Sequence, residues 1–135
     1  MTDAKTVVRD FYESYNGRDL DSTWERYIAA NLVNHAMGGA YQRAEWLAMD
    51  KTLFPAFADL HVEVLDQVGE GDKAATRYVM HGTQTGEFFG IPASGNKASL
   101  TGTSFDRVSD GKIAEHWADV DLGSFLQQLS GQPNG

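Results

Sequence analysis

The dipeptide Asp110-Gly111 is the feature that most limits how this chain can fold. It lies between two runs in which apolar and polar residues alternate. Two-residue hairpin turns need a positive φ at their central residues, and Asp-Gly is one of the pairs that tolerates it best. We therefore predict a β-hairpin in which a strand over residues 98–108 pairs with a strand over residues 112–121.

Side-chain alternation along the second strand of this hairpin creates a conflict. Strict alternation places one set of residues on a single face: Ile113, Glu115, Trp117, Asp119 and Asp121. The opposite face would carry Ala114, His116, Ala118 and Val120. If Ile113 and Trp117 face the core, the aspartates face it too, although a buried carboxylate is costly unless it is hydrogen-bonded or protonated. We interpret the conflict as the sign of a functional pocket.

Asp121 has a second possible role at the start of a helix. Four apolar residues follow it at helical spacing: Leu122, Phe125, Leu126 and Leu129. Aspartate is a preferred N-cap, so Asp121 could cap this helix, and capping does not exclude catalysis. Asp119 could be a solvated charge at the end of the strand.

The first half of the chain has helical periodicity. One-turn spacing predicts an amphipathic helix through Val7, Val8, Phe11, Tyr12 and Tyr15. Gly17 supplies its end. Ser22 and Glu25 have the spacing of a capping box for a second short helix. A third helix is predicted from Arg43, and Pro55 must end or kink it.

Residues 31–35 predict a short strand or an extended arm within the mainly helical first half. The second half has the period of strands, and residues 60–84 predict a hairpin that turns at residues 69–72. Residues 86–96 hold three glycines and a proline around apolar side chains, so we expect a long loop that can cover a pocket. Helices followed by antiparallel strands indicate the α+β class.

Composition excludes several classes of partner. With 135 residues, 41% of them hydrophobic, the chain is sized for a single domain, 1–135, with a flexible tail from about residue 130. Its net charge of −8 repels phosphate backbones and anionic lipids, so we expect neither nucleic acid nor membrane as a partner. There is no cysteine. Because no signal peptide or membrane span is evident, we expect a cytoplasmic protein.

Two segments resemble the SnoaL-like polyketide cyclase family. They are GTQTGEFFGIPASGNK at residues 82–97 and FDRVSDGKIAEHWADVDLGSFLQQLSG at residues 105–131. The early helices and the pair Asn34-His35 are similar to the family's N-terminal half. The family belongs to the nuclear-transport-factor-two-like superfamily. The resemblance therefore implies a cone-shaped α+β barrel, with N-terminal helices packed on a curved, mainly antiparallel sheet that encloses a pocket.

The resemblance also implies an activity. Similar proteins close rings in polyketides by intramolecular aldol chemistry without a cofactor, and Asp121 matches their catalytic aspartate. Asp119 instead resembles a position used by epoxide hydrolases of the superfamily, but the Arg-x-Asp pair that these enzymes need is absent from residues 74–84. Gln84 replaces a histidine common in the family. The alternatives are an epoxide or lactone hydrolase, a hydroxylase-like enzyme, or a non-catalytic small-molecule-binding module.

Aldol closure needs a base for a carbon acid and then an acid for the alkoxide. One carboxylate can serve both steps if an apolar pocket and a second carboxylate raise its pKa toward neutrality. The predicted catalytic residues are Asp121, Asp119 and His35. The predicted substrate-binding residues are Asn34, Tyr78, Met80, Gln84, Phe89 and Trp117. His61, His81 and His116 have a weaker claim to a site role.

The expected partner is a small hydrophobic or aromatic polyketide-like molecule. No pair of histidines has the spacing of a metal site, so we predict no metal. The resemblance implies that no cofactor is needed either. A homodimer is expected through the sheet face opposite the pocket. That face is predicted to carry Arg77, Val79, His81, Ala114, His116 and Ala118.

Overall fold

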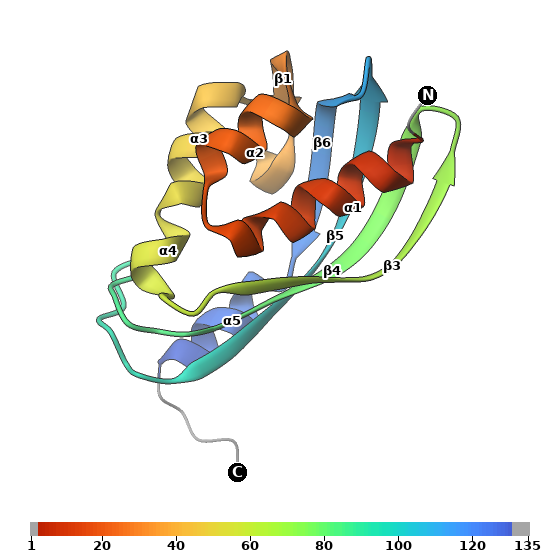
Figure 1. Cartoon of the computed structure of the whole chain (residues 1–135). Helices are drawn as coiled ribbons and strands as arrows, with labels where there is room; N and C mark the ends of the chain where they lie inside the picture. The colour runs from red at the N-terminus through yellow and green to blue at the C-terminus, as the bar shows by residue number, and fades with distance from the viewer. Residues whose placement is uncertain (1–2, 131–135) are drawn as a thin grey trace.

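The computed structural model describes residues 3–130, and the predicted flexible tail lies almost entirely outside the described residues (Figure 1). The helices are α1 Ala4–Ser14, α2 Leu20–Tyr27, α3 Arg43–Lys51, α4 Leu53–Ala56 and α5 Leu122–Leu129. Two 3₁₀ turns are η1 Tyr15–Gly17 and η2 Ala36–Gly38. The strands are β1 Ile28–Asn34, β2 Tyr41–Gln42, β3 His61–Glu70, β4 Lys73–Thr83, β5 Lys97–Ser109 and β6 Lys112–Val120.

The strands form one six-stranded sheet in the order β2-β1-β6-β5-β4-β3. β1 and β6 run parallel, and the other neighbours are antiparallel. The long strands curve, and α1, α2 and α3 lie over their concave side (Figure 1). The predicted α+β class, with N-terminal helices packed on a curved, mainly antiparallel sheet, is confirmed.

Aspartate side chains start the first two helices. Asp3 accepts a hydrogen bond from the backbone N–H of Thr6 at 2.8 Å, so it satisfies one of the free donors of α1. The N-cap of α2 is Asp19, and the predicted capping box at Ser22 was wrong. Ser22 donates both its backbone N–H and its hydroxyl to the Asp19 carboxylate. The acidic side chain therefore caps the helix one turn earlier than predicted.

The core fills the space between the helices and the sheet. Phe11 is fully buried in α1, and its ring centroid lies 5.6 Å from Trp24 and 5.5 Å from Trp46. A second group joins Phe57 to Phe125, with centroids 5.4 Å apart. Tilted aromatic pairs of this kind add to the free energy gained by burial alone. These two groups hold the helices at both ends of the concave face.

The β5–β6 hairpin turns as predicted but contains a bulge. Asp110 and Gly111 have φ of 52° and 77°, as a two-residue turn of this kind requires. Val108 pairs with Ile113, whereas Arg107 pairs with Glu115, so β6 has one extra residue at this point. Such a bulge reverses side-chain alternation beyond it, because the period of a strand is two.

The bulge decides which residues of β6 face the helices. His116, Ala118 and Val120 line the concave side, opposite Asp106, Ser104 and Gly102 of β5. Glu115, Trp117 and Asp119 lie on the outer face, where their partners are Arg107, Phe105 and Thr103. The prediction that Trp117, Asp119 and Asp121 face the pocket was therefore wrong. The assignment of His116 and Ala118 to the dimer face was wrong for the same reason.

Candidate active site

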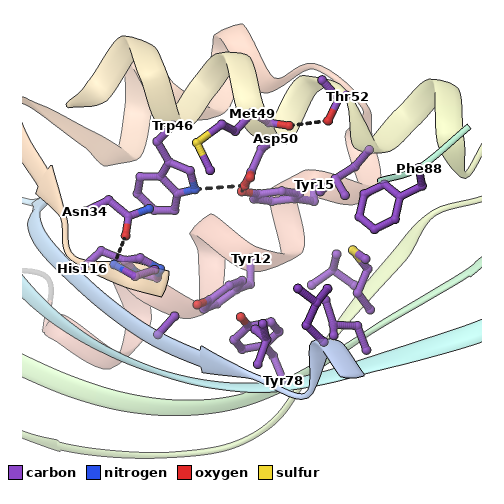
Figure 2. A pocket seen from close by; sticks show the side chains of 18 of the residues that line it. Tyr12, Tyr15, Asn34, Trp46, Met49, Asp50, Thr52, Tyr78, Phe88 and His116 are labelled. Carbon is purple, nitrogen blue, oxygen red and sulfur yellow. Dashed lines mark hydrogen bonds between the residues drawn. The ribbon is translucent and has the colours of Figure 1, made fainter. Parts of the chain in front are cut away.

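A cavity of about 450 Å³ opens between the helices and the concave face of the sheet. Aromatic and apolar side chains form most of its wall (Figure 2). Four of the predicted binding residues line it: Asn34, Tyr78, Met80 and Phe89. Cavities of a few hundred Å³ with apolar walls and a few polar groups are typical sites for small molecules.

A buried His–Asp pair lies in the wall of this cavity. Nδ1 of His116 on β6 is 2.5 Å from Oδ1 of Asp106 on the neighbouring strand β5. The side chain of Asp106 is 1% exposed and that of His116 is 5% exposed. Because a carboxylate can only accept, its contact requires a proton on Nδ1. In the neutral imidazole, Nε2 is then the unprotonated nitrogen.

A chain of hydroxyl groups holds the other oxygen of Asp106. Ser104 donates to Oδ2 at 2.8 Å, and the Tyr12 hydroxyl donates to Ser104 at 2.6 Å. The ring of Tyr12 stacks on Tyr78 with centroids 4.5 Å apart. Burial raises the pKa of the Tyr12 hydroxyl well above its usual range, so Tyr12 remains a donor. Both oxygens of the buried carboxylate are thus satisfied.

The imidazole of His116 lines the cavity. Asn34, which also lines the cavity, lies beside the imidazole (Figure 2). The indole of Trp46 stacks on the imidazole, with centroids 4.4 Å apart and planes 21° apart. This contact and Asp106 together fix the ring.

A second carboxyl group lies at the other end of the same indole. Oδ2 of Asp50 accepts hydrogen bonds from Trp46 Nε1 at 3.1 Å and from the Tyr15 hydroxyl at 2.5 Å. Asp50 is in the last turn of α3 and lines the cavity between Trp46 and Tyr15 (Figure 2). Burial raises the pKa of Asp50 to about 6, although the two donors and His116 oppose this shift.

Asn34 adds an amide at the end of β1. Its Oδ1 accepts the backbone N–H of Ala36 at 2.8 Å, which orients the side chain. Asn34 is 3% exposed and lines the cavity beside His116 (Figure 2). It adds a polar amide group to a mostly apolar wall.

Gln84 organises the loop at the cavity mouth but does not line the cavity. Its side chain is 1% exposed. Nε2 donates to the carbonyl oxygens of Gly86 and Ile91, while Oε1 accepts from the backbone and hydroxyl of Ser94. One amide therefore joins the two arms of the loop. The structure places Gln84 as a loop-holding residue, where the sequence predicted a ligand contact.

The tip of this loop presents an aromatic ring to the mouth. Phe88 and Ile91 exchange backbone hydrogen bonds of 3.0 Å and 2.9 Å around a two-residue turn. Phe89 in that turn has φ of 49°, which is uncommon for a bulky residue. Its ring is 62% exposed while still lining the cavity. The turn geometry thus directs Phe89 to the entrance.

Besides Gln84, four predicted site residues do not line the cavity: Asp119, Asp121, His35 and Trp117. Asp119 and Asp121 are exposed, and Asp121 caps α5 by accepting the N–H of Ser124 at 3.2 Å, which confirms its predicted capping role. His35 lies against the outer-face residue Trp117, with ring centroids 4.8 Å apart, and its Nε2 is 3.1 Å from Glu115. None of these four side chains is part of the cavity wall.

Within the described part of the chain, no group of three histidine or acidic side chains has the geometry of a metal site. No helix in that part is long and apolar enough to cross a membrane. That the protein needs no metal and no cofactor stays a prediction, because the donor geometry of the described residues does not test it.

The fold and the site define a class of small α+β protein with an apolar cavity under its helices. The SnoaL-like polyketide cyclase model matches residues 5–129, and the chain belongs to that family. Residues 5–129 include every residue that lines the cavity.

Similar proteins are found among both sequences and structures. The aklanonic acid methyl ester cyclase DnrD of Streptomyces peucetius is 25% identical over 127 residues, which cover 90% of this chain and 87% of DnrD. The crystal structure of wild-type IdmH, a proposed polyketide cyclase of Streptomyces antibioticus, is 33% identical with a TM-score of 0.85, covering 95% of this chain and 99% of IdmH. AclR, a proposed hydroxylase of Streptomyces galilaeus, is 25% identical with a TM-score of 0.86, covering 96% and 97%.

Proposed function

We propose that this protein is a cofactor-independent polyketide cyclase that closes a ring by an intramolecular aldol reaction. The observation that carries the proposal is the buried His116–Asp106 pair, whose histidine lines an apolar cavity. A base held by a buried carboxylate inside an apolar site is suited to removing a proton from carbon.

The base in this proposal is Nε2 of His116. It takes a proton from a carbon flanked by carbonyl groups, and Asp106 stabilises the imidazolium that forms. The resulting carbanion carbon forms a bond to a second carbonyl carbon, whose oxygen becomes an alkoxide and then receives a proton. The amide of Asn34 is placed to donate a hydrogen bond to the enolate oxygen. No atom is lost or gained in the net reaction.

The cavity wall favours a neutral substrate. Its described lining contains no lysine or arginine, whereas Asp50 and Glu87 both contribute to it. A carboxylate substrate would find no cation there and would be repelled, since the whole chain carries a net charge of −8. An ester or a ketone avoids this cost. DnrD, which acts on a methyl ester according to its name, fits the same preference.

Turnover of aklanonic acid methyl ester and of related neutral aromatic β-dicarbonyl compounds tests the proposal. We expect a product of unchanged mass, with no loss of activity on adding a chelator. His116→Ala and Asp106→Asn should each lower kcat by on the order of a hundredfold or more, because one removes the base and the other its orientation. His61→Ala is a matched control, since that histidine is exposed on β3.

Other outcomes identify the alternatives. A product heavier by one water would indicate an epoxide or lactone hydrolase, and a product heavier by one oxygen would indicate a hydroxylase-like enzyme. Binding without turnover would indicate a small-molecule-binding module. Full activity in folded His116→Ala would contradict the proposed base.

A further inference from the structure

Asp50 has the surroundings of a group that exchanges a proton with a ligand. Both hydrogen bonds it accepts, from Tyr15 and from Trp46, end on the same oxygen, Oδ2. Oδ1 has no hydrogen-bond partner among residues 3–130, where every fully enclosed polar side-chain atom has one. Oδ1 is therefore accessible from the cavity that Asp50 lines.

The groups that face Asp50 come from several elements. Those that interact with its charge or share the cavity wall are Tyr12, Tyr15, Tyr41, Tyr78, His116 and Glu87. Its neighbour Lys51 instead forms an ion pair with Asp21 on the outside, at 2.8 Å. Because burial outweighs the hydrogen bonds and His116, the pKa of Asp50 rises to about 6.

Trp46 links this carboxyl group to the proposed base. Its ring lies 4.4 Å from the imidazole of His116, and its Nε1 lies 3.1 Å from Asp50 Oδ2. One rigid side chain thus sets the relative position of the two titratable groups. The cavity wall therefore holds an imidazole and a carboxyl group at two ends of one indole.

We infer that Asp50 is the proton donor of the reaction, delivering a proton from Oδ1 to the alkoxide oxygen formed on ring closure. This inference rests on the proposed cyclase function. The balance is simple: the proton leaving carbon goes to His116 Nε2, and the proton leaving Asp50 Oδ1 goes to the new hydroxyl. The imidazolium then returns one proton to the Asp50 carboxylate through water, so both groups are reset. Trp46 and Tyr15 are positioning residues, because they act through Asp50.

The pH dependence of kcat/KM separates this role from a structural one. Only the protonated carboxyl can donate, so we expect kcat/KM of the wild type to fall about tenfold per pH unit above about pH 6. Asp50→Asn keeps an oxygen for Tyr15 and Trp46 but has no proton to transfer. It should lower kcat/KM at pH 6 by on the order of a hundredfold and abolish this fall.

Two further variants test the inference without removing the carboxyl. Tyr15→Phe and Trp46→Phe each delete a hydrogen bond that favours the charged form of Asp50. Both should therefore move the fall in kcat/KM to higher pH, a shift that a merely structural role would not produce. Asp21→Asn, which removes an exposed carboxylate beside α3, is the control and should leave the profile unchanged.

The outcomes distinguish the two proposals. Asp50 is supported as the proton donor if kcat/KM no longer falls with rising pH in Asp50→Asn. A shift of that fall to higher pH in Tyr15→Phe and Trp46→Phe supports it as well. An unchanged rate and profile in Asp50→Asn, with His116→Ala inactive, would overturn the role of Asp50 and leave the cyclase function intact. Absence of turnover by the wild type on every neutral ester and ketone would overturn both.

Discussion

A carboxyl group buried in a cavity wall weakens the fold, and Asp50 makes this measurable. Its pKa in the folded state is about 6, against 3.8 for an unperturbed aspartate. The folded state therefore binds the proton more tightly than the unfolded state. Stability from this group is complete below about pH 4 and is lost as the pH rises through about 6.

Asp50→Asn should remove this pH dependence. Relative to the wild type, the free energy of unfolding of the variant should increase between about pH 4 and pH 8, by at most about 3 kcal/mol. Urea unfolding of both proteins at the two pH values measures the difference. A difference that stays constant would mean that the carboxyl is not desolvated in the folded protein.

Asp121 is a cap whose loss should affect stability more than catalysis. Its carboxylate accepts the N–H of Ser124 outside the cavity. Asp121→Ala should cost about 1 kcal/mol of unfolding free energy, whereas Asp121→Asn should cost little, because asparagine also caps. Turnover should be near that of the wild type in both. Asp3→Ala, at the N-cap of α1, is the matched control.

A hundredfold loss of turnover in folded Asp121→Asn would contradict this assignment. It would restore the catalytic role that the resemblance implied for Asp121. Thermal unfolding of the same preparation separates that result from simple loss of the fold.

At the level of single residues, the sequence predicted residues of the cavity wall better than the titratable groups in it. Tyr78 and Met80 were placed correctly because the alternation of β4 is regular through them. Asp50 was missed, since its role depends on an indole and a phenol brought to it by tertiary packing. No local pattern distinguishes it from a charge on a solvated helix face.

At the scale of elements, the single bulge in β6 explains most of the misplaced site residues. A hairpin without it would pair Asp106 with Glu115, counting back from the Asp110-Gly111 turn. Like charges directly opposite each other are destabilising, so this clash was a signal of irregular register. With the bulge, Asp106 pairs with His116 and Glu115 pairs with Arg107. Both strands and their turn were predicted from the sequence, whereas the extra residue of the bulge was not.

The loop over residues 84–96 should control how tightly ligands are held. Phe89 stands at the mouth on a turn fixed by the contacts of Gln84. Phe89→Ala should weaken binding of a fused-ring aromatic ligand by about tenfold, because apolar contact at the entrance is lost. Fluorescence titration measures this, with Val68→Ala as the control at an exposed apolar residue on another element. Unchanged affinity would mean that Phe89 does not contribute to ligand binding.

At the scale of the whole molecule, the outer face of the sheet is the remaining apolar surface. Phe105 is 44% exposed there, and its ring centroid is 6.0 Å from that of Trp117. Charged pairs border these rings, including Arg107 with Glu115 at 2.8 Å and Arg77 with Asp66 at 2.7 Å. An aromatic centre with a charged border is typical of protein interfaces. The face differs from the predicted one mainly in its β6 residues.

The homodimer stays a prediction and is now assigned to this outer face. A stable interface needs about 800 Å² from each partner, roughly a tenth of the 7368 Å² surface of one chain. Sedimentation at micromolar concentration should give twice the mass of one chain. Phe105→Glu should give monomers, because its charge would be buried against a second copy without a partner. Val68→Glu should weaken the dimer as well, because Val68 pairs with Ala75 and Ala75 pairs with Phe105, which puts all three on the outer face.

Activity supplies the second readout for the dimer. The cavity lies on the concave side, whereas Phe105 lies on the outer face, so monomeric Phe105→Glu should keep the kcat of the wild type. A wild-type mass of one chain would contradict the dimer. A dimer that survives Phe105→Glu would place the interface elsewhere. Loss of kcat in a folded monomer would instead show that the partner supports the cavity.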